Sequence, residues 1–165
     1  MLWDSLRAET NTSWYVPDLV ANTLIAKIGC LQRKAFEMGD VILVVDDEPF
    51  VLNIVCCVLQ NAGFTVLRAG SAAEAMAVGS RHSDHIRLVL SDVVMPGLSG
   101  PSLAERFAQI HPETEFMFMA GLPDSPEVCE RILSRGRAFL PKPFVPRTLL
   151  DKVYEVLRGE LAAGG

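Results

Sequence analysis

Acidic side chains and one lysine stand where predicted strands end, and these residue types are suited to binding a cation and a phosphoryl group. Asp46-Asp47-Glu48 comes directly after an apolar run, Asp92 ends a second run, and Lys142 follows a third. Carboxylates held this close together repel one another, so some are protonated unless a cation compensates their charge. Oxygen ligands of this kind suit Mg²⁺, and an ammonium group can neutralise a carboxylate or bind a phosphoryl oxygen. Whether they act together depends on the fold.

Apolar runs alternate with amphipathic segments along the chain, which indicates alternating strands and helices. The run 41–45 is fully apolar, as expected for a strand buried on both faces of a parallel sheet. Ser71 with Glu74 forms a capping-box pattern at the start of a helix. We expect strands at 41–45, 64–67, 86–90, 116–119 and 138–140, and helices that begin near Pro49, Ser71, Pro101, Ser125 and Pro146. The pattern predicts an α/β fold with a doubly wound, five-stranded parallel sheet.

Ligands of doubly wound sheets bind at the carboxyl ends of the strands, which is where the acidic residues and Lys142 fall. A single Asp-Asp pair usually caps a turn or helix, and a single Lys-Pro is usually an ordinary surface feature. Their placement at three strand ends of one sheet favours the functional interpretation. We therefore expect one acidic pocket containing three carboxylates and one ammonium group.

The composition excludes several classes of protein. The 165 residues are 50% hydrophobic and 21% charged, which suits a folded core and not a disordered chain. A net charge of −5 argues against nucleic-acid binding as the main function. No apolar run approaches the roughly 18–20 residues that span a bilayer, and the four cysteines lack metal-ligand spacing. We expect a cytoplasmic protein with reduced thiols that binds neither membrane nor nucleic acid.

The N-terminal 38 residues differ from the rest of the chain. Their charges balance, and they contain both tryptophans, Trp3 and Trp14. Apolar residues at helical spacing predict a helix over about 18–36, with Asp18 as its N-cap. We expect an N-terminal extension over 1–38, one domain over 39–159 and a short tail over 160–165. Alternatively, Met38 is a natural start, and the extension then reflects a choice of start site.

Three motifs in order resemble the response-regulator receiver domain of two-component signalling, which is typical of bacteria. They are VVDDEP at 44–49, LSDVVMPG at 90–97 and LPKPF at 140–144. The similarity covers about 40–157, and the residues around 116–121 and 139–151 look most like receivers of hybrid histidine kinases. The resemblance implies the flavodoxin-like (βα)5 receiver fold. It also implies a signalling protein with at most self-catalysed phosphotransfer and dephosphorylation, and not an enzyme.

The resemblance assigns roles to the residues at the strand ends. Asp92 is implied as the phosphoacceptor, and Lys142 as the contact to the phosphoryl oxygens. The implied Mg²⁺ ligands are Asp47, Asp92 and the carbonyl of Val94, with Asp46 acting mostly through water. An Asp carboxylate can act as a nucleophile and form an acyl phosphate, and the metal offsets charge in the transition state. The Lys142–Pro143 bond is implied to be cis.

One position departs from the family pattern. Ala120 stands where receivers usually carry Ser or Thr, whose hydroxyl donates to the phosphoryl group and draws an aromatic switch residue, here Phe139, inward. The Gly121 N–H remains available in that segment. Three interpretations stay open: weakened coupling to Phe139, a phosphorylation-independent pseudo-receiver that binds proteins, or simple tolerance of Ala. We favour the first.

The implied partners are proteins. A histidine kinase or a histidine phosphotransfer protein would supply the phosphoryl group, directly or within a phosphorelay. Only 159–165 follow the last predicted helix, so we expect a stand-alone receiver, a monomer or weak homodimer. Its downstream partner would bind the face formed by the helix after Ser125, the strand 138–140 and the last helix. A rival interpretation, a Mg²⁺-dependent phosphatase or flavin binder, needs an additional acid or base or a phosphate-binding loop, and we find neither.

Overall fold

The computed structural model describes residues 39–82, 84–121, 132 and 137–159. The chain divides into two units, Met1–Phe36 and Glu37–Gly165, and every described residue lies in the second. The predicted helix over 18–36 and the predicted helix after Ser125 lie outside the described residues.

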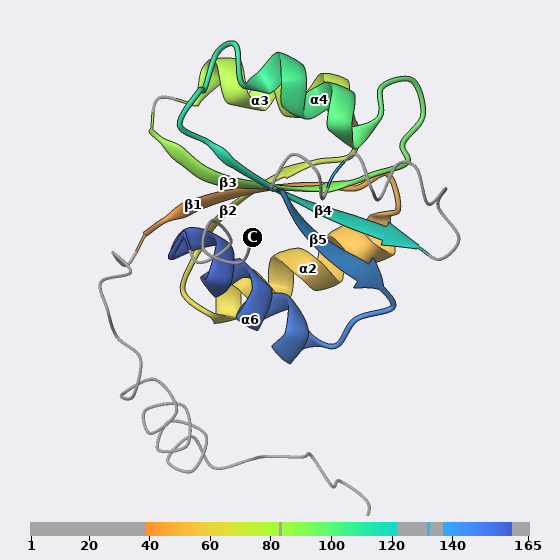
Figure 1. Cartoon of the computed structure of the whole chain (residues 1–165), viewed down its shortest axis with the longest axis vertical. Helices are drawn as coiled ribbons and strands as arrows, with labels where there is room; N and C mark the ends of the chain where they lie inside the picture. The colour runs from red at the N-terminus through yellow and green to blue at the C-terminus, as the bar shows by residue number, and fades with distance from the viewer. Residues whose placement is uncertain (1–38, 83, 122–131, 133–136, 160–165) are drawn as a thin grey trace, which may run out of the picture. The chain divides into compact units, whose positions relative to one another are not determined.

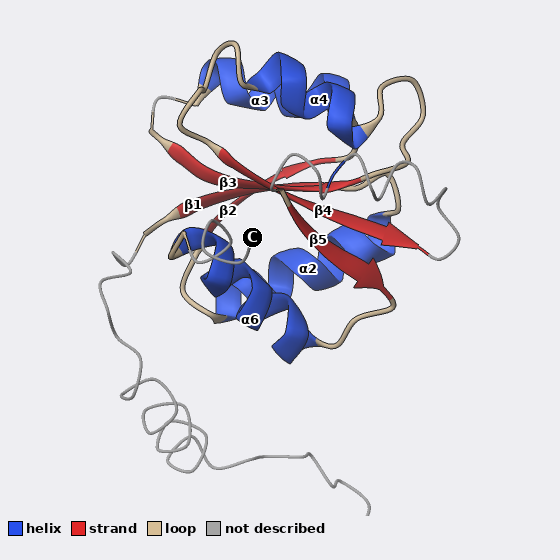
Figure 2. Cartoon of the chain, in the orientation of Figure 1, coloured by secondary structure: helices blue, strands red, loops and turns tan. Residues whose placement is uncertain are grey.

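A five-stranded parallel sheet forms the centre of the second unit (Figures 1 and 2). The strand order is β2-β1-β3-β4-β5, with the register unbroken except for one irregularity between Val41 and Ile42. The strands are β1 Val41–Val45, β2 Thr65–Ala69, β3 Ile86–Asp92, β4 Glu115–Gly121 and β5 Ala138–Lys142. Central β3 lies between β1 and β4, so residues at its end have neighbours on both sides.

Helices cover both faces of the sheet. α2 (Pro49–Asn61) and α6 (Pro146–Leu157) pack on one face, and α3 (Ala72–Arg81) and α4 (Gly100–Phe107) pack on the other (Figure 1). Core residues of β1, β3 and β4 are almost wholly buried between these layers, as the apolar runs predict. The prediction of a doubly wound α/β sheet is confirmed.

Local sequence explains where the helices begin. Ser71 caps α3, because its hydroxyl accepts a hydrogen bond from the Glu74 N–H at 3.2 Å. The Glu74 carboxylate accepts from the Gly70 N–H at 2.8 Å, one residue earlier than in a standard capping box. Ser99 caps α4 in the same way, and Pro49 and Pro146 occupy first turns of α2 and α6.

Several boundaries differ from the sequence predictions. The candidate residues Asp92 and Gly121 end β3 and β4, as the sequence predicts. The parallel ladder continues through the polar residue, because pairing of Asp92 with Met119 uses main-chain groups only. β2 spans Thr65–Ala69 in place of 64–67, and β5 extends to Lys142 in place of 140. Within the described residues, no helix is both long and apolar enough to cross a membrane.

Candidate functional site

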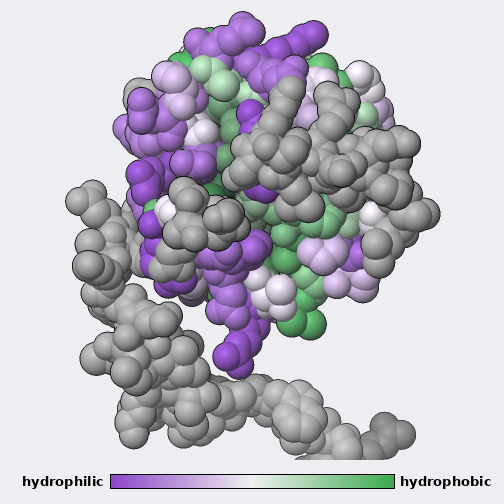
Figure 3. All heavy atoms as spheres, viewed as in Figure 1, coloured by the Kyte–Doolittle hydropathy of each residue, from purple (hydrophilic) through white to green (hydrophobic). Residues whose placement is uncertain are grey.

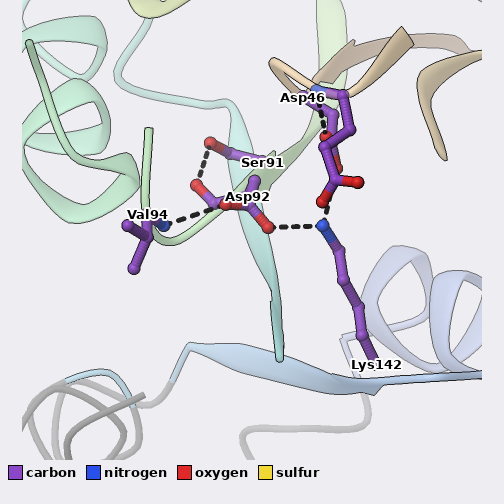
Figure 4. A network of polar contacts seen from close by, with 6 residues as sticks. Asp46, Ser91, Asp92, Val94 and Lys142 are labelled. Atoms are coloured by element: carbon purple, nitrogen blue, oxygen red, sulfur yellow. Dashed lines mark hydrogen bonds and ion pairs between the residues drawn. The ribbon is translucent and has the colours of Figure 1, made fainter. Parts of the chain in front are cut away.

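The ends of three strands bring Asp46, Asp92 and Lys142 into direct contact (Figure 4). The Lys142 ammonium lies 2.8 Å from Oδ2 of Asp46 and 2.6 Å from Oδ1 of Asp92. One cation therefore joins two carboxylates from β1 and β3 through charge-assisted hydrogen bonds. Asp46, Ser91 and Asp92 are the buried polar residues of the described chain, so buried polar chemistry is concentrated here.

Asp46 follows β1 and is only 1% exposed. Its main-chain N–H donates to the Ala69 carbonyl at 3.2 Å, which holds the residue against the end of β2. Its Oδ1 accepts from the Glu48 N–H at 2.9 Å, just before α2 begins. Both carboxylate oxygens are thus occupied, one by the main chain and one by Lys142.

Asp92 is the last residue of β3 and is 7% exposed. Its Oδ2 accepts from the Val94 N–H at 3.0 Å, and its Oδ1 accepts from Lys142. Burial raises the pKa of the Asp92 carboxyl and the charge of Asp46 adds to the rise, against the opposing effect of Lys142 and the Val94 N–H. The negative charge at this residue is therefore incompletely compensated by the protein.

Lys142 ends β5 and is half-buried. Burial alone would lower the pKa of its ammonium group, but hydrogen bonds and attraction from Asp46 and Asp92 outweigh burial and raise it. The group therefore stays protonated through the neutral range. The following Lys142–Pro143 peptide bond is cis, the form that the resemblance implies.

Asp47 occupies a different position from its neighbour. It lies exposed in the loop between β1 and α2. Of the three carboxylates expected to converge, Asp46 and Asp92 therefore do so and Asp47 does not. Successive side chains of an extended segment point in different directions, which separates the two aspartates. In the described part of the chain, no three His, Cys, Asp or Glu side chains form a group that could hold a metal ion.

The site nevertheless fits a hard divalent cation. Asp46 and Asp92 bear two formal negative charges against one ammonium group, and burial, with the charge of Asp46, raises the pKa of the Asp92 carboxyl. Mg²⁺ keeps several waters and takes only one or two carboxylates directly, so it does not need a cage of protein side chains. Charge and donor type at this edge of the sheet therefore match the expected ion.

The end of β4 supplies no polar side chain to the site. Ala120 is 1% exposed and belongs to the hydrophobic core, while Gly121 is exposed with open space around its Cα. Phe139 of β5 is half-buried and packs against the same core. Ala120 therefore stands at the strand end where the resemblance places a hydroxyl.

Sequence reasoning missed one participant. The hydroxyl of Ser91 donates to the main-chain carbonyl of Asp92, the candidate phosphoacceptor, at 2.9 Å (Figure 4). A polar residue inside an otherwise apolar run, immediately before an Asp, is the sequence signal that could have pointed to it.

Comparison with known proteins identifies the family. Residues 42–154 match the model of the response regulator receiver domain. The chain is 34% identical over 137 residues to the sensor kinase CckA of Brucella abortus, covering 80% of this chain and 14% of that protein. It is 30% identical over 110 residues to the C4-dicarboxylate transport regulatory protein DctD of Rhizobium meliloti, covering 67% of this chain and 24% of that protein. The chain thus spans a small part of these relatives.

Solved structures support the same family assignment. The CheY-like receiver domain protein of Methanospirillum hungatei superposes with a TM-score of 0.65 at 30% identity, covering 76% of this chain and 98% of that chain. The receiver domain of the hybrid histidine kinase CckA gives a TM-score of 0.60 at 31% identity, covering 71% and 98%. This chain belongs to the response regulator receiver domain family, and the predicted likeness to receivers of hybrid kinases is confirmed. Such domains are signalling modules and not enzymes of the usual kind.

Proposed function

We propose that this domain accepts a phosphoryl group on Asp92 from a phosphohistidine of a histidine kinase or a phosphotransfer protein. The observation that carries the proposal is the ammonium of Lys142, which lies 2.6 Å from Oδ1 of Asp92. A buried carboxylate with a cation beside it provides a nucleophile together with a group that can neutralise the incoming phosphoryl oxygens.

Phosphoryl transfer to Asp92 changes no oxidation state, so it needs no oxidant or reductant. An oxygen of Asp92 forms a bond to phosphorus while the phosphorus–nitrogen bond of the donor breaks, and the bonding electrons stay on the imidazole. Lys142 can then pair with a phosphoryl oxygen, and we propose the N–H of Gly121, an exposed residue at the neighbouring strand end, as a further donor. We infer that Asp47, Asp92 and the Val94 carbonyl hold Mg²⁺, with Asp46 acting through water. A bound Mg²⁺ would offset charge on the transferring group.

A phosphohistidine donor is carried by a protein, which would cover the mouth of the site. Exposed apolar side chains surround it: Phe50 is 75% exposed at the start of α2, Val94 is 61% exposed after β3, and Val145 is 60% exposed before α6. Figure 3 shows polar atoms over α3 and α4, and an apolar patch toward β5 and the start of α6. A phosphohistidine cannot reach Asp92 without its carrier contacting this rim, so these side chains suit the donor interface.

The downstream partner is proposed to bind the face that includes β5 and α6, whose third element lies outside the described residues.

We further propose a cytoplasmic receiver over 39–159 with an extension over 1–38 and a tail over 160–165. We propose that it is monomeric or weakly dimeric. Phosphorylation adds about −1.5 to −2 charges and would bias an existing equilibrium between two conformations.

A second candidate function rests on Ala120. Its methyl group is buried in the core and cannot donate a hydrogen bond, so the described site lacks the usual link to Phe139. A receiver without that link could bind its partner without phosphorylation. The intact arrangement of Asp46, Asp92 and Lys142 favours phosphorylation with altered switching over this alternative.

Acetyl phosphate tests the proposal without a protein donor. The full chain with Mg²⁺ and acetyl phosphate should gain one phosphoryl mass, which Asp92→Ala and Asp92→Asn abolish. The matched control is Asp84→Asn, because Asp84 is an exposed carboxylate just before β3, at the opposite end of that strand from Asp92, and this variant should be labelled normally. Chelation of Mg²⁺ should stop labelling. Absence of labelling by acetyl phosphate and by candidate kinases would refute phosphorylation and favour the second function.

A further inference from the structure

Ser91 is a buried polar residue for which the phosphoryl chemistry above has no use. It is 0% exposed and lies in central β3, paired with Val45 of β1 and Phe118 of β4. Burying a hydroxyl is unfavourable unless it forms a hydrogen bond, and alanine would satisfy an apolar strand at this position. The hydroxyl donates to the Asp92 carbonyl at 2.9 Å, so its hydrogen bond is to the main chain of the candidate phosphoacceptor.

The beginning of α4 closes over the same carbonyl. A Cβ at Gly100 would lie 2.3 Å from the Asp92 carbonyl oxygen and 3.1 Å from Oγ of Ser91, so only glycine fits. The Gly100 N–H donates to the Val93 carbonyl at 3.0 Å, which holds the helix start in place. Ser91, Asp92 and Gly100 therefore form a close-packed group beneath the site.

This group fixes the peptide that carries the reactive side chain. The carbonyl of the Asp92–Val93 peptide is held by Ser91, and the N–H of the same peptide donates to the Met119 carbonyl at 2.9 Å. The next N–H, that of Val94, donates to Oδ2 of Asp92 at 3.0 Å. Rotation of the Asp92–Val93 peptide would move this second donor and the carboxylate that it orients.

We propose that Ser91 is a positioning residue for phosphorylation of Asp92, acting through its hydrogen bond to the Asp92 carbonyl. This inference rests on the proposed function. Ser91 does not touch the phosphoryl group; it orients the peptide from which the nucleophile and the Val94 main chain project. Small errors in the position of a nucleophile lower a rate strongly, so the effect should fall on the reaction more than on the fold.

The reaction to follow is transfer from acetyl phosphate in the presence of Mg²⁺. The Asp92 oxygen forms a bond to phosphorus, the bond from phosphorus to the acetyl oxygen breaks, and acetate leaves with the electron pair. Ser91→Ala should slow the initial rate at saturating acetyl phosphate about ten-fold, with half-saturation nearly unchanged. Ser91→Thr, which keeps the hydroxyl, should restore the rate to within about two-fold of the original.

A matched control lies at the other end of the same strand. The hydroxyl of Thr114 donates to the Ile86 carbonyl of β3 at 2.7 Å, so Thr114→Val removes the same kind of hydrogen bond far from Asp92. Thermal melts of all variants, with rates measured well below each transition, separate stability from rate. Thr114→Val should lower stability without slowing phosphorylation.

Each outcome decides the inference. A normal rate in Ser91→Ala, an unrestored rate in Ser91→Thr, or equal slowing in Thr114→Val would overturn it, the last by showing that strand stability alone matters. If the unsubstituted chain takes up no phosphoryl group, the proposed function fails and Ser91 has no reaction to position. Normal labelling of the unsubstituted chain with normal Ser91→Ala kinetics leaves the proposed function standing and removes only this inference.

Discussion

The two sides of Asp92 are built differently. On the polar side of the site, the Lys142 ammonium lies 2.8 Å from the Asp46 carboxylate and 2.6 Å from the Asp92 carboxylate. On the apolar side, the end of β4 carries Ala120, whose buried methyl group offers no hydrogen bond, and Gly121, where an added Cβ would meet nothing within 4 Å. Groups that would accept and neutralise a phosphoryl group are in place on the polar side, whereas the apolar side has no side chain that could donate a hydrogen bond to it.

This difference separates two tasks that one site usually combines. Accepting the group depends on charge, and charges act over several ångströms even when geometry is imperfect. Signalling its presence depends on a directed hydrogen bond, which a methyl group cannot form. A domain can therefore retain the first task while losing much of the second, and substitutions on each side should have different effects.

The largest effect is expected on the polar side. Lys142→Met removes the cation between two buried carboxylates, and breaking a buried ion pair costs about 3–5 kcal/mol. Denaturant unfolding without Mg²⁺ should show this loss, and added Mg²⁺ should recover part of it by supplying positive charge. Lys152→Met is the control, because the Lys152–Glu155 pair is part-exposed on α6 and should change stability by less than about 1 kcal/mol. Equal losses in both variants would contradict a special role for Lys142.

Two glycines near Asp92 compare a crowded position with an open one. Gly100→Ala places a methyl group 2.3 Å from the Asp92 carbonyl, so α4 must shift, at a cost of about 2–3 kcal/mol. Gly121→Ala meets nothing within 4 Å and should change the free energy of unfolding by less than about 1 kcal/mol. Urea titrations of both variants measure the contrast. Similar values for the two would show that the sides are equally tolerant.

Placing a hydroxyl at residue 120 should partly remove the difference between the polar and apolar sides of the site. In Ala120→Thr, a hydrogen bond to the phosphoryl group would be worth about 1.5 kcal/mol or more, roughly ten-fold in the switching equilibrium. NMR shifts of the Phe139 ring before and after phosphorylation should then respond more strongly than in the unsubstituted chain. Ala120→Val matches the shape of threonine without its hydroxyl and should not. An equal response in both would attribute the change to side-chain size.

The smallest effect concerns pH. A raised carboxyl pKa means that folding disfavours the charged form, so the contribution of Asp92 to stability falls as pH rises through that range. Asp92→Asn should therefore be modestly more stable than the unsubstituted chain at pH 7. The difference should vanish below about pH 4, where the free carboxyl is protonated in both folded and unfolded states. A lower free energy of unfolding in Asp92→Asn than in the unsubstituted chain at pH 7 would contradict an unfavourable charge at Asp92.

Much of this site follows from sequence because parallel strands end at one edge of a sheet. The parallel direction of the strands places Asp46, Asp92 and Lys142 at one edge of the sheet, and their residue types then favour ion pairing. The sequence does not reveal that one ammonium contacts both carboxylates, or that Asp47 stays exposed. Those depend on rotamers and on the twist of neighbouring strands. The role of Ser91 was missed because its partner is a main-chain atom, which no residue type signals.

Reactivity should likewise differ between adjacent thiols in α2. Cys57 is exposed, whereas Cys56 is 2% exposed and burial raises the pKa of its thiol, despite the nearby charge of Arg68. Because the thiolate is the reactive form, an alkylating reagent should label Cys57 in the folded domain and both residues after unfolding. Peptide mass mapping distinguishes the two sites, and equal labelling in the folded domain would contradict the packing of Cys56.

None of the 13 residues of α2 carries a charge, and its outward surface includes Phe50 and Ile54. Contacts made through this helix can draw little of their strength from attraction between opposite charges. Added salt should therefore leave such an association nearly unchanged, where a charged interface would weaken. A partner that docks there would have to be distinguished from its competitors by shape, and any long-range steering would have to come from other parts of the surface.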